Sequence, residues 1–393
     1  MNADVVIIGG GVVGCSTAYH LRRDGFSGRV VIVERDGTYA RASSHLAMGG
    51  IRQQFGSAVN IGLVQWSVPF WKRFDAEMSV GGHVARANFR QRGYLFLVDE
   101  PHREAFERRL ELQLELGARV ERLTVGEIAR LWPGLNLDDL SFGVFGPEDG
   151  YGDPREVVRG FRAGARAAGA EWIDDEVIAI ERRGDRVQGV GLARGGALGA
   201  GVVVNAAGPY AARVGTLAGV TLPVSPVRQH LFRCALPEPW PYRFPMIVDP
   251  SGVHWRHDDP DHHSDLDRIV IAHTKVDEPA GENFEVDPHR WERDYFPTLV
   301  ARLPRFRDLR LIEGWAGLYE MTPDHNPLLG EWPELPGFFI AAGFSGHGLM
   351  MSPATGKVMS ELIRLGRAQT VDVSPLAPDR FARNAPFHDG ALI

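Results

Sequence analysis

The chain of 393 residues contains two cysteines, Cys15 and Cys234, and no apolar run that approaches the ~20 residues a membrane span needs. Two cysteines cannot build a disulfide framework, so we expect a reducing compartment and a cytoplasmic protein with no membrane span. Basic blocks are missing too, because 43 basic and 50 acidic residues are dispersed and give a net charge of -7. This composition excludes typical nucleic-acid-binding proteins and favours a small-molecule ligand.

Apolar residues make up 44% of the chain, which is enough to fill two cores over a length that exceeds one ordinary domain. The first apolar run begins at about residue 4 without a charged leader, so we do not expect secretion. No internal repeat or low-complexity tract is visible, and no pattern indicates an oligomeric state.

The most informative motif lies in the first 34 residues. An apolar strand at 5–8 enters a turn with Gly9, Gly11 and Gly14, a helical stretch follows, and a second strand ends at Glu34. Gly9 permits the tight turn, Gly11 lets the backbone approach a pyrophosphate, and Gly14 allows the helix to pack closely. An acid about twenty residues further on is typical of a ribose anchor. The segment therefore predicts a dinucleotide-binding turn.

A second glycine turn follows the apolar strand at 338–342 and spans Gly343 to Gly348, before a helix expected from Ser352 to Leu365. Two such turns, one near each end of the chain, favour a long cofactor held at both ends, so FAD fits better than NAD. The positive end of the second helix would then lie near the flavin N1 and C2 carbonyl. A loop that only avoids side-chain clashes explains this second turn equally well.

The order of patterns predicts an α/β fold with a Rossmann-type FAD-binding domain interleaved with an α+β substrate domain built on an antiparallel sheet. We expect the first domain to comprise 1–80, 150–225 and 321–375, and the second to comprise 81–149 and 226–320, with a tail at 376–393. No further strand-glycine-helix motif with a ribose acid is present, which argues against a nicotinamide dehydrogenase.

Five segments together resemble the FAD-dependent amine and amino-acid oxidoreductases, a family that includes D-amino-acid oxidase, glycine oxidase, monomeric sarcosine oxidase and dimethylglycine dehydrogenase. They are the first glycine motif with Glu34, and the segments 43–55, 205–210, 317–324 and 343–348. The segments 50–55 and 343–348 look closest to the sarcosine oxidase branch and to a mitochondrial branch of FAD-dependent oxidoreductase-domain proteins.

This resemblance implies oxidation of an amine or amino acid by transfer of a hydride equivalent from the carbon next to nitrogen to flavin N5, followed by hydrolysis of the imine. The flavin supplies the chemistry, so no strong catalytic base is required. Oxygen or another acceptor would then take the electrons. A flavin-containing assembly or interaction protein is the alternative, and it would carry a plugged pocket over the flavin.

The resemblance also implies site residues. Arg52 matches an arginine that binds the substrate carboxylate in the sarcosine oxidase branch, and a guanidinium offers two parallel hydrogen bonds to such a group. Tyr319, His254 and Met350 are the other candidates for the substrate pocket. The candidates for FAD binding are Gly9, Gly11, Val12, Val13, Gly14, Glu34, Arg35, Ser43, Ser44, His45, Met48, Gly49, Gly50, Val177, Ala207, Gly208, Gly343, Gly346, His347, Gly348 and Leu349.

The chain departs from that branch at several positions. Met350 stands where sarcosine oxidases carry a lysine that shares the carboxylate, and Gly317 stands where they carry the cysteine that attaches to the flavin. We therefore expect non-covalent FAD, with a bond to His45 left open. The strand 268–273 has apolar residues where those enzymes carry a lysine that speeds reaction with oxygen, although Lys275 is close. Dehydrogenase and oxidase therefore both remain possible.

The loop 257–267 is rich in histidine and aspartate. Its spacing matches neither a calcium loop nor a zinc pair, so we expect a polar connection and no metal.

Overall fold

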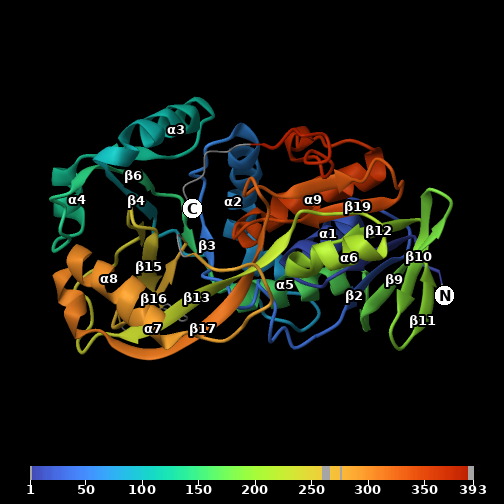
Figure 1. The fold of residues 1–393 in the computed structure, drawn as a ribbon, viewed down its shortest axis with the longest axis horizontal. Coiled ribbons are helices and arrows are strands. Elements are labelled where there is room, and N and C mark those ends of the chain that lie inside the picture. The colour runs from blue at the N-terminus through green and yellow to red at the C-terminus, as the bar shows by residue number, and fades with distance from the viewer. Residues whose placement is uncertain (1, 259–265, 275–276, 388–393) are drawn as a thin grey trace.

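The computed structural model describes residues 2–258, 266–274 and 277–387. Its helices and strands form two lobes along the longest axis of the molecule, one around a six-stranded sheet and one around an eight-stranded sheet (Figure 1). The long strands β13 (Ser225–Ala235) and β17 (Arg310–Met321) extend from the second lobe toward the first (Figure 1). Within the described residues, no helix is both long and apolar enough to cross a membrane.

The six-stranded sheet has the dinucleotide-binding turn at its centre. Its order is β18 (Leu328–Glu331), β19 (Phe338–Ala342), β12 (Val202–Asn205), β1 (Val5–Ile8), β2 (Val30–Glu34) and β8 (Glu171–Asp174). All pairs are parallel except β18–β19. Because β12, β1 and β2 are parallel neighbours, Gly9, Glu34 and the segment after Asn205 meet at one edge of the sheet.

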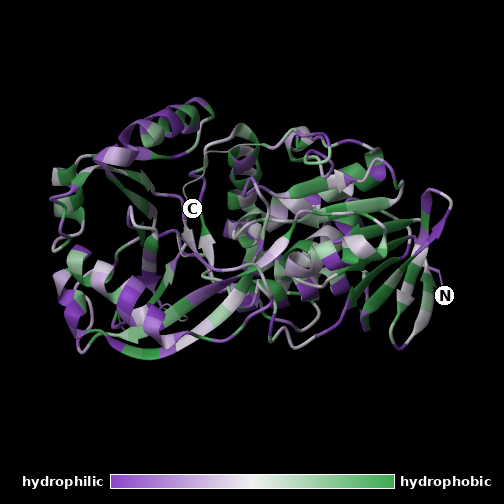
Figure 2. Ribbon diagram, viewed as in Figure 1, coloured by the Kyte–Doolittle hydropathy of each residue, from purple (hydrophilic) through white to green (hydrophobic). Residues whose placement is uncertain are grey.

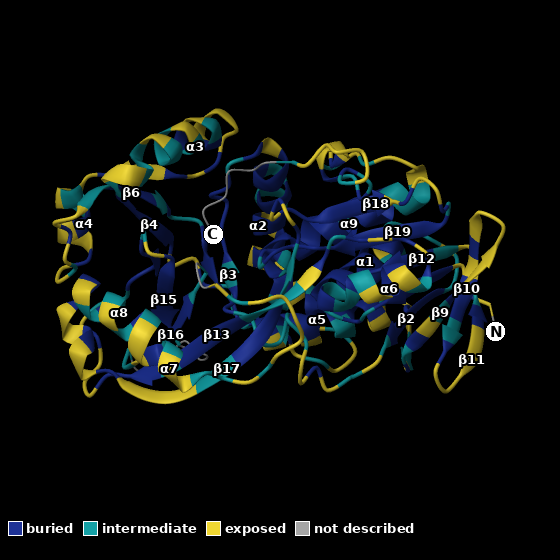
Figure 3. Cartoon of the chain, viewed as in Figure 1, coloured by how far each residue is buried: buried dark blue, intermediate teal, exposed yellow. Residues whose placement is uncertain are grey.

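Both faces of this sheet are covered, which explains the unbroken apolar sequence of β1. Val5 and Ile7 pack among α1 (Val12–Arg23), α2 (Ala58–Met78), α5 (Pro154–Ala167) and α9 (Gly348–Leu365). Val6 and Ile8 pack on the opposite side, against α6 (Ala211–Leu217) and a three-stranded sheet of β11 (Gly196–Gly199), β10 (Arg186–Leu192) and β9 (Val177–Arg183). The central strands are hydrophobic in Figure 2 and buried in Figure 3.

Helix α9 begins at Gly348, which is earlier than the expected start at Ser352. Pro353 therefore lies inside the helix and cannot donate a backbone hydrogen bond to the Leu349 carbonyl. The Ser352 hydroxyl donates to that carbonyl instead, at 2.8 Å. This side-chain bond allows the helix to continue through the proline.

The eight-stranded sheet forms the second lobe. Its order is β17, β13, β16 (Arg268–His273), β15 (Val253–His257), β14 (Met246–Val248), β4 (Tyr94–Asp99), β6 (Leu140–Gly146) and β5 (Glu121–Leu123). The pairs are antiparallel except β14–β4, which is parallel. The helices of this lobe are α3 (Arg103–Glu115), α4 (Val125–Leu131), α7 (Pro288–Arg290) and α8 (Phe296–Arg302) (Figure 1). A two-stranded sheet of β3 (Gly50–Ile51) and β7 (Gly150–Tyr151) completes the fold.

Candidate active site

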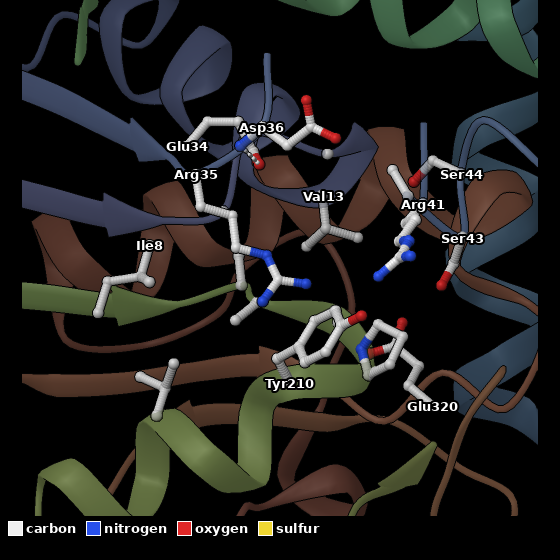
Figure 4. Close-up of a pocket in the computed structure, with 18 of the residues that line it drawn as sticks. Ile8, Val13, Glu34, Arg35, Asp36, Arg41, Ser43, Ser44, Tyr210 and Glu320 are labelled. Carbon is white, nitrogen blue, oxygen red and sulfur yellow. Dashed lines mark hydrogen bonds between the residues drawn. The ribbon is translucent and has the colours of Figure 1, made fainter. Parts of the chain in front are cut away.

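A cavity of about 710 Å³ opens at the edge of the six-stranded sheet where β1, β2 and β12 end (Figure 4). One part of its lining is Glu34, Arg35 and Asp175, and another is Tyr319 and Glu320. The sequence-predicted residues that line it are Gly9, Gly11, Val12, Val13, Glu34, Arg35, Ser43, Ser44, Val177, Ala207, Gly208, Tyr319, Gly346, Gly348 and Leu349. The structure thus brings most of the predicted cofactor residues together around one cavity.

Gly9 and Gly14 of the turn after β1 leave no room for side chains. Gly9 has φ +100°, and a Cβ on it would lie 2.5 Å from the Ala206 carbonyl oxygen. A Cβ on Gly14 would lie 1.9 Å from the Gly9 carbonyl oxygen, so Gly14 serves the close packing of α1 and does not line the cavity. The amino end of α1 therefore faces the cavity with bare backbone, which suits a pyrophosphate.

Glu34 lies at the end of β2 with its carboxylate held by backbone. One oxygen accepts a hydrogen bond from the Gly10 amide at 2.7 Å, and the other accepts from the Asp36 amide at 2.9 Å. Burial raises the pKa of this carboxyl above its ordinary value, and the two backbone bonds oppose that shift. Each oxygen keeps a lone pair, so the carboxylate can still accept from ribose hydroxyls.

Sequence reasoning predicted Arg35 at this end of the cavity but missed Tyr210, Glu282 and Arg41. The Arg35 guanidinium stacks 3.7 Å from the centre of the Tyr210 ring, and the Tyr210 hydroxyl donates to Glu282 at 3.0 Å. Arg41 extends toward the cavity from the loop that carries Ser43 and Ser44 (Figure 4). These residues come from segments far apart in the chain, so no local spacing could have joined them.

Tyr319 and Glu320 line the cavity from the end of β17. A Cβ on Gly346 would lie 2.6 Å from the Tyr319 ring, and Gly346 has φ +97°, so this glycine is required where the loop crosses the tyrosine. Burial raises the pKa of Tyr319 to about 12. Glu320 was not predicted, although it directly follows Tyr319.

Arg52 does not line the cavity, but it lies beside the Tyr319 end. Its guanidinium contacts the His347 ring nitrogen Nε2 at 3.1 Å and donates to the Gln54 carbonyl. It stacks 4.2 Å from the centre of the Phe55 ring, and it is 4% exposed. Among the described residues, Arg52 forms no ion pair with a carboxylate.

His254 lies on β15 and is buried, with Nδ1 3.1 Å from the Gly252 carbonyl oxygen. Burial, with smaller contributions from the charges of His273 and Arg52, lowers its pKa to about 4, so the imidazole is neutral at pH 7. A small cavity of about 20 Å³ lies nearby, with Gln229, His273 and Tyr319 in its lining. One cluster of residues therefore lies beside the cavity; it contains His254, His273, Tyr319 and Arg52.

Met350 lies elsewhere than expected, because its side chain packs in the core shared by α1, α2, α5 and α9. Its carbonyl accepts from the Trp71 indole at 3.2 Å. It lines neither cavity, so the structure does not support Met350 as a pocket residue. Met350 lies in the first turn of α9, which begins at Gly348.

The remaining predicted cofactor residues surround the cavity without lining it. His45 is half-buried, with Nδ1 3.1 Å from the Tyr39 carbonyl oxygen, and burial lowers its pKa. Met48 lines the small cavity. The others in this group are Gly49, Gly50, Gly343 and His347. The roles of these residues in FAD binding stay predictions.

Most of the histidine- and aspartate-rich loop, and also Lys275, lies outside the described residues. In the part of the chain that the structure describes, no three histidine, cysteine, aspartate or glutamate side chains gather as metal ligands would.

The fold and cavity together define a flavoprotein. The turn after β1, the ribose-competent Glu34 and a cavity closed at its far side by a second glycine turn fit FAD, whose two halves need both ends of such a site. The chain belongs to the family described as FAD dependent oxidoreductase, whose family model matches residues 4–362. This confirms FAD as the cofactor and oxidoreductase as the class of enzyme.

Several relatives share nearly the whole chain. FAD-dependent oxidoreductase domain-containing protein 1 of Bos taurus is 31% identical, over 96% of this chain and 85% of its own. Mitochondrial sarcosine dehydrogenase of Mus musculus is 29% identical over 93% of this chain, which spans 40% of that protein. The structure of L-proline dehydrogenase from P. horikoshii has a TM-score of 0.87 and 28% identity, covering 98% of this chain and 99% of that one. These matches confirm the predicted fold class.

Proposed function

We propose that this protein oxidises an amino acid at the carbon next to nitrogen, giving an imine that water hydrolyses. The observation that carries the proposal is Arg52, a buried guanidinium that forms no direct ion pair with a carboxylate among the described residues, although the charge of Asp149 acts on it from a distance. Burying a charge without a directly bonded counter-ion is costly, so such a group is typical of a site that receives an anion from its ligand. A substrate carboxylate is that anion.

The substrates named for the relatives support this class. The relatives include sarcosine and dimethylglycine dehydrogenases, L-proline dehydrogenase and a glycine oxidase. Each of these substrates carries one carboxylate beside a nitrogen. A single arginine is enough to bind such a group in two-pronged fashion, and the rest of the substrate can remain apolar.

The protein's own residues would bind and orient the substrate, while bound FAD supplies the two-electron acceptor. Arg52 would fix the carboxylate, and Tyr319 and His254 would line the space beside it. Because the pKa of His254 is about 4, its ring is a neutral hydrogen-bonding partner at pH 7 and adds no positive charge near the amine. Burial beside these residues disfavours the ammonium form, so it favours the uncharged amine, which is the form that can be oxidised.

We propose a dehydrogenase rather than an oxidase, with an acceptor other than oxygen. The support is the middle of β16, where Ile269, Val270, Ile271 and Ala272 are all buried and apolar, so none of these four residues offers a cation. An oxidase remains the alternative. Admitting air to the substrate-reduced enzyme distinguishes them, because an oxidase recovers its flavin colour at once and a dehydrogenase recovers it slowly.

The test is anaerobic bleaching of the flavin band of the purified holoprotein by a panel of N-methyl, D- and L-amino acids and cyclic amines. Bleaching by one class of amino acid supports the proposal and identifies the substrate class. If no member reduces a fully loaded flavin that dithionite does reduce, the proposal fails and the flavin-containing assembly protein becomes the better account.

A further inference from the structure

Glu320 is a carboxyl group inside the cofactor cavity without a positive partner. One of its oxygens accepts a hydrogen bond from the Gly343 amide at 2.8 Å, and the Phe344 amide also donates to the carboxylate. Among the described residues it forms no ion pair. Burial raises its pKa to about 7, and the two backbone bonds limit that rise.

Other charged residues line the same cavity, Arg35 and Arg41 among them, but among the described residues none forms an ion pair with Glu320. The neighbour of Glu320 across the strand pair is Pro226 on β13, and Gly208 and Gly348 also lie beside its carboxylate. A Cβ on Gly348 would lie 3.6 Å from Glu320 Oε1. The titratable groups on these elements are engaged elsewhere, since the Tyr210 hydroxyl donates to Glu282 and His347 Nε2 contacts Arg52.

The position of Glu320 relative to FAD follows from the rest of the cavity. Glu34 anchors the ribose of the adenosine half, and the amino end of α1 faces the pyrophosphate. The opposite part of the lining, which contains Tyr319, Glu320 and the amino end of α9, is left for the flavin half. Reduction places negative charge on this half of the cofactor.

Two features at this end therefore act in opposite directions. The amino end of α9 stabilises negative charge, because its free amides carry partial positive charge. An ionised Glu320 opposes it, because like charges in a partly buried site repel strongly. The carboxylate also accepts from two amides of the loop before α9, which reduces what that loop offers to the flavin.

We infer that Glu320 tunes the reduction potential of the bound flavin through its protonation. The potential is lower when Glu320 is ionised and higher when Glu320 is protonated. Two electrons and one proton reduce the flavin and leave one negative charge on it. That charge raises the affinity of Glu320 for a proton, so the carboxylate takes one further proton from water. Up to two protons then accompany two electrons, whichever donor supplies the electrons.

The effect of Glu320 on the reduction potential depends on pH. Well below pH 7 Glu320 is protonated in both redox states and has no effect. Above pH 7 it is ionised in the oxidised protein, so the potential falls below that of a protein with a neutral group at this position. The inference concerns the FAD site alone and does not depend on the identity of the substrate.

The experiment measures the reduction of the holoprotein by dithionite in equilibrium with a reference dye, from pH 5.5 to 8.5, for wild type and Glu320→Gln. A neutral amide mimics the protonated carboxyl. We expect the equilibrium constant for reduction of Glu320→Gln to exceed that of wild type about eightfold at pH 8.5, as for a pKa coupling of one unit, and to agree within about twofold at pH 5.5. With that coupling the wild type should take up about 1.5 protons per two electrons near pH 7.5, and the variant one.

Glu334→Gln is the matched control, because it removes the same charge from an exposed loop residue. Glu320→Asp keeps the carboxylate and should keep the pH dependence, which makes the test independent of whether Glu320→Gln retains FAD. The inference would be overturned if the equilibrium constants for reduction of wild type and Glu320→Gln changed with pH in the same way. So would weaker FAD binding by Glu320→Gln at an unchanged potential, since that result would make Glu320 a ligand of the ribityl hydroxyls only.

Discussion

Arg52 illustrates how much of a site depends on the surroundings of one residue. A guanidinium buried among the rings of Phe55, Tyr94 and Phe96 gains cation–π attraction, with ring centres 4.2 to 5.9 Å away. This attraction offsets only part of the cost of burial, so a ligand carboxylate has a large effect on the site.

We predict that Arg52→Ala raises the KM for the amino-acid substrate about 10- to 100-fold, because a charge-assisted hydrogen bond contributes roughly 1.5–3 kcal/mol. The KM of Arg52→Lys should lie between those of wild type and Arg52→Ala, since an ammonium keeps the charge but cannot form the two-pronged contact. Steady-state kinetics with the flavin content measured in parallel checks this. Unchanged KM at full flavin content would remove Arg52 from the substrate site.

Asp149 is a buried carboxyl that sequence reasoning missed. Its Oδ1 accepts from the Gln53 amide and side chain at 3.1 and 3.2 Å, while Oδ2 has no hydrogen-bond partner in the described part of the chain. Burial raises its pKa to about 7. A raised pKa stabilises the folded state at low pH, and this contribution is lost as pH rises from about 4 to 7.

Asp149→Asn removes the charge and keeps the oxygen that Gln53 uses. We predict that the variant is more stable than wild type at pH 8, by on the order of 2 kcal/mol, and gains nothing at pH 4.5. Thermal unfolding followed by circular dichroism at the two pH values measures the difference. An equal effect at both would contradict the assignment of a buried, titrating carboxyl.

Single residues were predictable where a local motif carried them. Gly9, Gly11 and Glu34 belong to one short strand-turn-helix-strand unit, so spacing alone located them. Glu320 and Arg41 have no such pattern, because the cavity brings them together from β17 and from the loop after β2. No spacing within a segment records a contact between segments.

At the scale of elements, the crossing of α1 and α9 determines how closely the second glycine turn approaches the cofactor. A Cβ on Gly356 of α9 would lie 2.2 Å from the Ser16 hydroxyl and 2.6 Å from the Ser16 backbone on α1. The helices therefore touch through backbone, and α9 cannot move away without changing the position of its amino end at Gly348.

We predict that Gly356→Ala lowers the free energy of unfolding by about 2–4 kcal/mol and weakens FAD binding, because overpacking a helix crossing forces backbone shifts. Gly126→Ala on α4 is the control. A Cβ there meets nothing within 4 Å, so alanine should stabilise the helix by roughly 0.5–1 kcal/mol. Equal effects of the two substitutions would contradict the close crossing.

The start of α9 shows why an element can be recognised while its boundary is not. Pro353 suggested a first turn, since proline is favoured there. The structure instead compensates for proline inside the helix with the Ser352 hydroxyl, and that compensation is a tertiary detail. Met350, near the observed start of the helix, packs in the core.

For the whole molecule, the fold class was predictable because alternating strands, helices and glycine turns define a Rossmann-type sheet. The separate sheet of β9, β10 and β11 was not predicted, nor was the parallel pair β14–β4, since partner choice between distant strands leaves no local pattern. The domain boundaries and the substrate roles of Arg52, Tyr319 and His254 stay predictions.

The mode of FAD attachment is a property of the assembled protein. Gly317 has no side chain to bond the flavin, and His45 Nδ1 already contacts the Tyr39 carbonyl oxygen. We predict that acid precipitation of the holoprotein leaves a colourless pellet and a yellow supernatant. Colour that stays in the pellet would show a covalent bond, with His45 as the first residue to substitute.

The central claim is that the carboxylate of an amino acid is bound next to the flavin. Rapid anaerobic mixing of the holoprotein with matched pairs, sarcosine against dimethylamine and proline against pyrrolidine, tests it most directly. The account predicts that at least one carboxylate-bearing member reduces the flavin at least about 100-fold more efficiently than its partner, a difference of roughly 2.7 kcal/mol. Equal reduction by both members of every pair would contradict it.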